Sequence, residues 1–461
     1  MVETEAKLDA SDDLATVPPY RLMQRAGYGW IPSDLTNALR VSWDEYLAGQ
    51  LAYESIIDTG VEARLALLPT LSMTSAQLYP IFNHIRVGEL ISSRVLRAVY
   101  SRRQLFERMV EFWHDHFNVY VFKSECPALT TSYDRDAIRP HALGKFKDLL
   151  KATAMSPAMI TYLDNRTNNK FGPNQNYARE LLELHTLGLA SAFTENDVKE
   201  VARCFTGWSV IEHENDPNRG QFIFRPENHD QGAKTVLGHP IPANGGMQDG
   251  ITVLEILADH PLTASSIANK LATFFYGTLP PKAYVRSIDV IFRFSGGDIR
   301  STLQVALASS HLTKAPPLLR RPFHQFATCT RAILANVAQT GEYRNLLLEA
   351  GNQPFHWSPP NGYPLAQDYW KGNMLPRWGF AMELCANRID GVSVPSSNLV
   401  KGLPTLSLVL DSISKSLFAN AMPESLRASL SFFAGQQTVL SDRALRDLYG
   451  LAMSAPEFQH G

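Results

Sequence analysis

The chain has 461 residues, 45% of them hydrophobic and 19% charged, with a formal net charge of −2. This length guarantees a sizeable core, and the composition is typical of a soluble globular protein. The balanced charge and the lack of a long basic block argue against a nucleic-acid partner. No run of about 18 apolar residues is present, so the sequence predicts no membrane span.

The amino-terminal segment 1–18 is polar and acidic, and we predict that it is disordered or loosely attached. It lacks the apolar stretch of a secretory signal, so the sequence as given predicts a cytoplasmic location. Four isolated cysteines form no CxxC pair, which argues against both a disulfide framework and a zinc ribbon. They are Cys126, Cys204, Cys329 and Cys385.

Apolar residues recur at helical spacing along most of the chain, and no alternation of strands and helices is visible. The sequence therefore predicts a mainly α fold, a large multi-helix globular body with one small β-hairpin or irregular insertion. The predicted helical stretches are 33–52, 76–118, 136–155, 174–187, 195–205, 249–276, 284–293 and 298–309, with further helices after about residue 316.

The predicted insertion covers residues 208–248, where turn residues replace the helical period. Within it, QFIFRP and KTVLG read as short strands joined by ENHDQG, which predicts a hairpin or a long active loop. The insertion would separate an amino-terminal helical part, 19–207, from a carboxy-terminal helical part, 249–461, and the two helical parts are expected to pack as one body.

A second irregular segment, 351–370, is rich in proline, glycine and aromatic residues. Loops of this kind on a helical scaffold often carry binding groups. Trp357, Asn361 and Tyr363 are therefore candidate substrate-binding residues, and the aromatic rings in this segment could stack on a carbohydrate. The expected partner is a small molecule or a carbohydrate.

The stretch FWHDHFNVYVF, residues 112–122, places two histidines around an aspartate at the end of a predicted helix. On a helical wheel His116 lies in the middle of the apolar face, and His114 lies at its edge. Arg108, Glu111 and Asp115 fall on the opposite face and are predicted to point outward. His116 is thus the stronger candidate ligand, although a buried histidine can equally be a hydrogen-bonded core residue.

The stretch NYARELLELHTLG, residues 176–188, carries a second polar pair on a predicted helix. On the helical wheel, Glu180 and His185 are predicted to point toward the interior. Burying a carboxylate there costs free energy unless it is paired, protonated or metal-bound. Arg179 and Glu183 fall together on the far side, spaced as an exposed ion pair.

A third candidate is the pair His229 and Asp230 in RPENHDQGAKT, within the irregular insertion. A His-Asp dipeptide in a loop is a weak signal by itself. It gains weight if the loop folds over the helices that carry His116 and Glu180. Three separate segments that each supply an inward histidine or carboxylate point to a common site.

These blocks resemble a bacterial family known as domain of unknown function 1800. The matching stretches include RAGYG, EFWHDHFNV, YDRDAIRPHALGKFKDLL, SPAMITYLDN, PNQNYARELLELHTLG, VARCFTGW, HDQGAKTVLG and PPNGYP, and the resemblance runs from about residue 20 to about residue 450. The resemblance implies which blocks belong together, but it assigns no reaction. Members of the family are often exported, whereas this chain shows no amino-terminal export signal. A second departure is Gln175, which stands where the family usually has glutamate.

The leading hypothesis is a metal-dependent enzyme, hydrolytic or oxidative, with a divalent metal held by His116, His185 and Glu180. His114, His229 or Asp230 would complete the ligand set, and zinc, iron and manganese all suit such donors. One alternative is a metal-free glycoside hydrolase or lyase, in which Glu180 donates a proton and Asp230 acts as the base. The other is a non-catalytic helical binding or scaffold protein. The sequence does not determine the oligomeric state.

Overall fold

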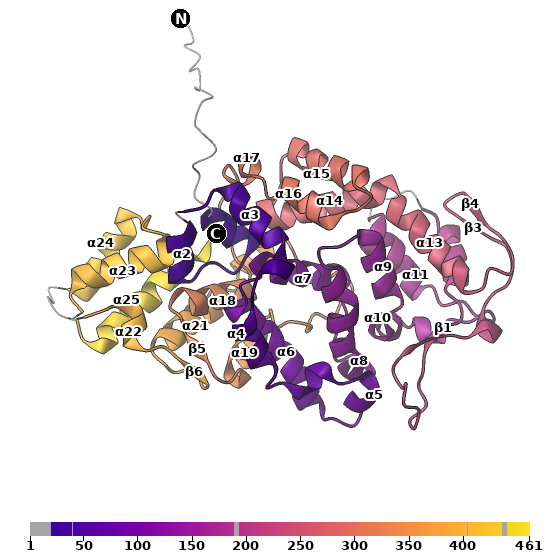
Figure 1. Cartoon of the computed structure of the whole chain (residues 1–461), viewed down its shortest axis with the longest axis horizontal. Helices are drawn as coiled ribbons and strands as arrows, with labels where there is room; N and C mark the ends of the chain where they lie inside the picture. The colour runs from indigo at the N-terminus through magenta and orange to yellow at the C-terminus, as the bar shows by residue number, and fades with distance from the viewer. Residues whose placement is uncertain (1–19, 39, 189–192, 403, 436–439) are drawn as a thin grey trace, which may run out of the picture.

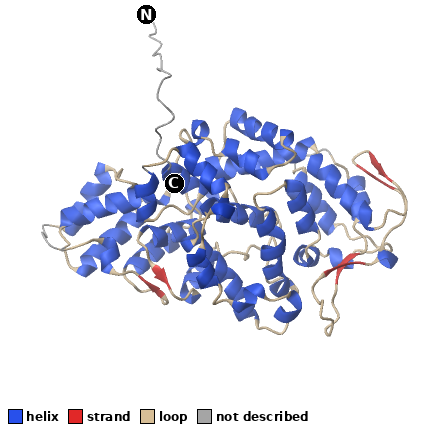
Figure 2. Ribbon diagram, viewed as in Figure 1, coloured by secondary structure: helices blue, strands red, loops and turns tan. Residues whose placement is uncertain are grey.

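A computed structural model of the chain describes residues 20–38, 40–188, 193–402, 404–435 and 440–461. The predicted loose segment 1–18 therefore lies outside the described residues. Helices form most of this part of the chain, and its sheets are three small antiparallel pairs of strands (Figures 1 and 2). The predicted mainly α fold is confirmed. Across these ranges, no helix has both the length and the apolar character needed to cross a membrane.

The first hydrophobic core surrounds helix α7, whose Met109, Phe112 and Trp113 are fully buried. This core includes buried residues as far along the chain as Ala315. Helices that precede and follow the strand-containing segment 208–241 therefore share one interior. The α-helices that precede this segment are α1 (Tyr20–Ala26), α2 (Pro32–Ala38), α3 (Trp43–Leu51), α4 (Thr59–Leu65), α5 (Ser75–Leu78), α6 (Asn83–Tyr100), α7 (Gln104–His116), α8 (Cys126–Ser132), α9 (Phe146–Ala154), α10 (Pro157–Tyr162), α11 (Asn176–Glu180) and α12 (Glu195–Cys204).

Local signals explain where several of these helices begin. Ser42 and Thr194 each form a capping box with the acidic residue three positions later, and the hydroxyl satisfies a backbone N–H of the first turn. Asp298 caps the helix that follows it through its carboxylate, which accepts from the backbone N–H of Ser301 at 2.8 Å. After the strands come α13 (Met247–Asp259), α14 (Pro261–Tyr276), α15 (Lys282–Phe294), α16 (Ile299–Ala306) and α17 (Ser309–Leu312).

A second core lies mainly between α18, α21 and α25, where the rings of Phe326 and Phe380 stack with centroids 3.7 Å apart. Helices α22 to α25 form the far left of the molecule in Figure 1. The elements of this part are α18 (Pro322–Ala332), β5 (Asn336–Val337), α19 (Gly341–Glu349), α20 (Gln367–Lys371), α21 (Leu375–Cys385), β6 (Val392–Ser393), α22 (Ser396–Leu399), α23 (Leu406–Phe418), α24 (Glu424–Ala434), α25 (Asp442–Ser454) and α26 (Pro456–Gln459).

The two predicted strands exist, but the predicted hairpin between them is wrong. β2 (Phe222–Phe224) pairs back with β1 (Trp208–Val210), and β3 (Lys234–Val236) pairs forward with β4 (His239–Ile241). A two-residue turn closes the second pair, with φ of 50° at Leu237 and 79° at Gly238. Two positive φ angles fit a tight hairpin, but leucine is an unusual residue there, so the turn carries no familiar sequence signal.

The four cysteines are buried and unpaired, as their isolation in the sequence predicts. Burial raises the pKa of the Cys126 and Cys204 thiols to about 12, which keeps both protonated near neutral pH. They pack as small apolar side chains.

Candidate functional site

The three polar residues at the end of α7 point to three different surroundings. His114 meets Asp134, Asp115 meets Arg321, and His116 lies in the first core. The prediction that His116 faces the interior is confirmed, since it is 5% exposed. The prediction that Asp115 faces solvent is wrong, because the chain around Tyr363 covers it and supplies a backbone N–H to its carboxylate.

His114 and Asp134 form a buried imidazole–carboxylate pair. Nε2 of His114 lies 2.8 Å from Oδ1 of Asp134, whose other oxygen accepts from Nε of Arg139 at 2.7 Å. Burial opposes ionisation of Asp134, but Arg139 and His114 outweigh it and hold the pKa of that carboxyl well below its usual range. An ionised carboxylate only accepts, so Nε2 carries the proton and the lone pair of His114 sits on Nδ1.

Burial lowers the pKa of His114 itself, although Asp134 acts in the opposite direction. The ring is therefore neutral near pH 7. Tyr133 and Phe355 hold it edge-on, with centroids 5.7 and 4.9 Å away. A neutral imidazole with a fixed tautomer and a locked orientation is the arrangement that a general base requires.

Asp115 has the opposite electrostatic character. Burial raises the pKa of its carboxyl to about 6, and nearby Glu111 adds to this, against the attraction of Arg321. Nη1 of Arg321 lies 2.6 Å from one oxygen of Asp115. With a pKa of about 6, the carboxyl is present in both its protonated and its ionised form near that pH. A carboxyl that keeps a proton near neutrality can act as an acid.

A buried network of charged residues supports this pair from α6 and α7. Glu107 accepts from Arg94 at 3.1 Å and from Arg139 at 2.9 and 3.0 Å, and it is 2% exposed. Arg108 and Glu111, which the helical wheel predicts to point outward, are also buried and form an ion pair with each other. That prediction is wrong because α7 is enclosed on all sides, so its polar face packs against other charged residues rather than against water.

One cavity collects these groups. It has a volume of about 30 Å³, enough for one or two water molecules, and lies between α7, α6 and the segment 352–363. Its polar lining consists of Arg94, Glu111, His114, Asp115, Asn118, Arg321, Asn352 and Tyr363. His114 and Asp115 thus line the same cavity.

The predicted substrate-binding residues belong to the segment that covers this cavity. Tyr363 lines it, Trp357 packs on Tyr363 with ring centroids 5.0 Å apart, and Nε1 of Trp357 donates to Asn361. Asn118 holds the segment down by donating to the carbonyls of Trp357 and Pro359 at 2.9 and 2.7 Å. Binding of a substrate by these residues stays a prediction.

Gly362 lets this segment approach the end of α7. Its φ is +68°, and a Cβ there would overlap the carbonyl oxygen of Asp115. We expect Gly362→Ala to lower the free energy of unfolding by more than about 1 kcal/mol, because alanine is strained at this φ and has no room. Urea denaturation checks this, with Gly372→Ala as the control, since Gly372 has a negative φ and open space around it. Equal stability of the two variants would contradict the expected close approach.

His116 and His185 approach each other, with ring centroids 6.2 Å apart, but they share their surroundings with a lysine. Nζ of Lys270 lies 3.1 Å from Nδ1 of His116 and 2.8 Å from the carbonyl of Leu184, and Nε2 of His116 donates to the carbonyl of His185 at 3.0 Å. Burial and Lys270 lower the pKa of both histidines, so both are neutral.

These donors do not fit a metal ion in this arrangement. Both nitrogens of His116 are engaged, and the Lys270 amine occupies the lone pair that a cation would need. Glu180 is half-buried and makes no hydrogen bond or ion pair within the described residues, while burial raises the pKa of its carboxyl. The described part of the chain contains no group of three or more His, Cys, Asp or Glu side chains placed to hold a metal. Nε2 of His185 is buried and has no hydrogen-bond partner among the residues that the structure describes.

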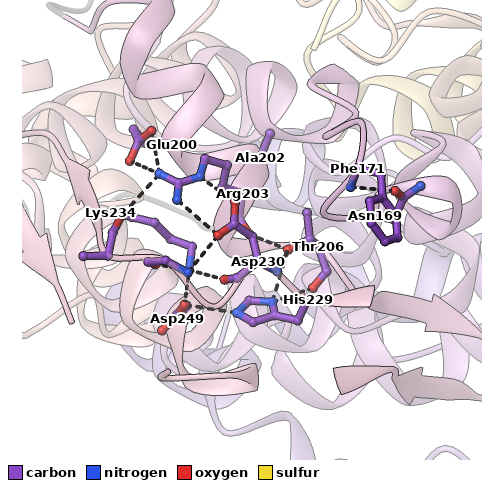
Figure 3. Close-up of polar contacts among 12 residues, drawn as sticks. Asn169, Phe171, Glu200, Ala202, Arg203, Thr206, His229, Asp230, Lys234 and Asp249 are labelled. Atoms are coloured by element: carbon purple, nitrogen blue, oxygen red, sulfur yellow. Dashed lines mark hydrogen bonds and ion pairs between the residues drawn. The ribbon is translucent and has the colours of Figure 1, made fainter. Parts of the chain in front are cut away.

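His229 and Asp230 take part in a separate, fully bonded network (Figure 3). His229 is completely buried, with Nδ1 2.8 Å from the carbonyl of Thr206 and Nε2 3.1 Å from Asp249. Arg203 binds both oxygens of Asp230 and lowers the pKa of that carboxyl. These bonds tie the segment after β2 to α12 and α13, and within the described ranges no hydrogen bond or ion pair joins His229 or Asp230 to His114 or His116. A catalytic role for the pair stays a prediction.

Two π-helical turns supply the partners of the two α7 histidines. Asp134 lies in Tyr133–Ile138, and His185 lies in Leu181–Thr186. In such a turn the backbone bonds span five residues, as from Leu187 N–H to the Leu182 carbonyl at 2.9 Å. The helical wheels drawn from the sequence covered only α7 and residues 176–188, so they did not bring in Asp134 and its partner Arg139, which are five residues apart at a π turn. π turns occur frequently at functional sites.

The chain was compared with known families, curated proteins and solved structures. Residues 21–460 match the sequence profile described as "Protein of unknown function (DUF1800)". The chain belongs to the DUF1800 family. The DUF1800 match includes α7, both π turns and the segment over the cavity. Neither the curated proteins nor the solved structures gave a match.

Proposed function

We propose that this DUF1800 protein is an acid–base enzyme, most simply a hydrolase, that works in the cavity between α7 and the segment 352–363. The observation that carries the proposal is that a neutral His114, paired with Asp134, and the protonatable Asp115 line the same small cavity. Burial lowers the pKa of His114, which suits a base, and raises the pKa of Asp115, which suits an acid. Such a pair of opposite shifts is typical of an acid and a base in one active site.

In the proposed reaction, Nδ1 of His114 removes a proton from a water molecule. The water oxygen attacks the electrophilic centre of the substrate, while Asp115 transfers its proton to the leaving atom. Asp134 holds the imidazolium that forms, as the carboxylate of a catalytic triad does. A proton passed from His114 to Asp115 restores the starting state, so the cycle needs no other reactant.

The size and charge of the site support hydrolysis of a polar substrate. The cavity has room for a water beside His114 but not for a whole substrate. Arg321 and Asn352 line it and can donate hydrogen bonds, and the exposed Asn361 and partly exposed Trp357 lie on the covering segment outside. The scissile group would enter the cavity, and the rest of the molecule would lie against this segment.

The pH dependence tests the assignment. Screening the protein against chromogenic esters, glycosides and phosphoesters identifies a substrate, whose kcat/KM is then measured from pH 4 to 9. We expect activity to fall about tenfold per pH unit well above pH 6, as Asp115 loses its proton. In Asp115→Asn the remaining activity would lack this decline. A wild-type decline that persists unchanged in Asp115→Asn would contradict Asp115 as the acid.

The metal centre predicted from His116, His185 and Glu180 stays a prediction, and no step above passes through it. The orphaned Nε2 of His185 favours it, and the position of Lys270 counts against it. Elemental analysis of untagged wild-type protein and of His185→Gln tests it, since a site-bound metal would be present in the first and lost from the second.

A further inference from the structure

The beginning of α18 gathers more buried positive charge than its acidic neighbours offset. His324, 4% exposed, has Arg108, Arg320, Arg321 and Arg25 around it. Burial and these four guanidiniums hold the pKa of His324 well below its usual range, so the imidazole itself stays neutral. Such a cluster is costly in a protein interior unless negative charge balances it.

Carboxylates offset two of the four arginines. Arg108 pairs with Glu111, and Arg321 pairs with Asp115 and, at 3.5 Å, with Glu111. Because Asp115 holds its proton part of the time, even this compensation is incomplete.

The other two arginines contact neutral oxygens. Arg25 donates to the carbonyls of Phe275 and Tyr276 at 3.1 and 3.2 Å and to that of Pro316, and Arg320 donates to the carbonyl of Phe458. Neither forms an ion pair with a carboxylate side chain among the residues that the structure describes. Their charge is therefore hydrogen-bonded but not paired with a carboxylate side chain of the described residues.

Several nitrogen atoms of the same cluster have no hydrogen-bond partner in the described part of the chain. Nε of Arg25, Arg108 and Arg320, and Nε2 of His324, are buried and without a hydrogen-bond partner within the described ranges. Unsatisfied donors of this kind cost about 1–3 kcal/mol each. Their concentration on one side of α18 indicates a missing acceptor.

A cavity of about 30 Å³ lies at this point and is lined by Arg108, Arg320, Arg321, His324 and Trp370. Its size admits one or two water-sized particles, which excludes a metabolite. The 11-residue helix α18 begins here at Pro322, and its positive end adds to the attraction for negative charge.

We propose that this cavity binds a small inorganic anion of halide size. The anion would accept from His324 and the neighbouring guanidiniums and would neutralise the surplus charge beside α18. Arg321 lines both this cavity and the one that holds Asp115, so the anion would also steady the guanidinium that contacts Asp115. The site is independent of the proposed reaction and would exist even in a non-catalytic protein.

The test compares sodium chloride with sodium gluconate at equal ionic strength, because gluconate is too large for the cavity. We expect the melting temperature to be higher in chloride than in gluconate and, above the dissociation constant, to keep rising with the logarithm of the chloride concentration, as binding to a single site on the folded protein requires. His324→Leu should weaken the chloride response at least tenfold. Arg388→Gln, which removes an exposed guanidinium paired with Glu383, should retain it.

A direct measurement covers the case in which His324→Leu does not fold. Line broadening of the chloride-35 resonance by folded wild-type protein, reversed by added bromide but not by gluconate, would support the site. Equal melting temperatures in the two salts, or no specific broadening, would overturn the proposal. A chloride response of equal size in folded His324→Leu would also overturn it.

Discussion

Replacing Glu107 by glutamine is expected to lower the free energy of unfolding by about 3–5 kcal/mol, the cost of breaking a buried ion pair on one side. Glu107 is 2% exposed and accepts from both Arg94 and Arg139. Burial disfavours its charge, but Arg139 and Arg97 outweigh this and lower the pKa of its carboxyl. In the variant, Arg94 would stay buried without its carboxylate, whereas Arg139 would keep Asp134.

Urea denaturation measures this loss, with Glu383→Gln as the matched control. Glu383 also pairs with an arginine, but on the surface, where such a pair contributes about 0–1 kcal/mol. A double variant, Glu107→Gln with Arg94→Gln, sharpens the test. This variant also removes the guanidinium of Arg94, which Glu107→Gln alone leaves without a carboxylate. Its free energy of unfolding should therefore be higher than the sum of the two single losses predicts. A Glu107→Gln protein within 1 kcal/mol of wild type, or strict additivity, would show that the network contributes little.

In the proposed reaction, His114→Gln should reduce kcat about 10²- to 10⁴-fold, because glutamine cannot take up a proton. Asp134→Asn should also reduce kcat, although it keeps a side chain of the same shape. An amide at this position can no longer stabilise the imidazolium, and it can turn the ring into the wrong tautomer. KM should change little in both variants, since neither side chain is assigned to substrate binding.

Far-UV circular dichroism and urea denaturation of each variant separate a lost base from a lost fold. His84→Gln serves as the control for His114→Gln, since His84 is exposed and should leave kcat unchanged. A folded His114→Gln protein with wild-type kcat would rule out His114 as the base. The same result in folded Asp134→Asn would leave the base in place but remove the role assigned to the carboxylate.

The sequence predicts the class of fold and several local details because these depend on neighbouring residues. Apolar spacing predicts the helices, Thr194 and Asp298 cap the beginnings of α12 and α16, and the four cysteines are unpaired. Arg179 and Glu183 form the expected surface pair at 3.8 Å, as positions four apart on a helix allow. The blocks that resemble DUF1800 also lie within the matched region.

The candidate site depends on contacts that sequence spacing does not encode. Asp134, Arg139 and Arg321 reach α7 from segments 18 to 205 residues away, counted from His116, and two of the three lie at or beside a π turn. The helical wheel assigned Asp115 to solvent because it describes α7 alone. In the protein α6, α18 and the segment around Gly362 enclose that face, and this burial raises the pKa of Asp115.

The sequence by itself thus determined a mainly helical protein of the DUF1800 family and identified the histidine motif of α7 as a place of interest. Only the tertiary structure decided which histidine faces a cavity. His116 lies in the core with Lys270, whereas His114 meets a carboxylate and an enclosed space. The reason is physical: helical periodicity determines the direction of a side chain, but the segments that pack against it determine its charge state and its partners.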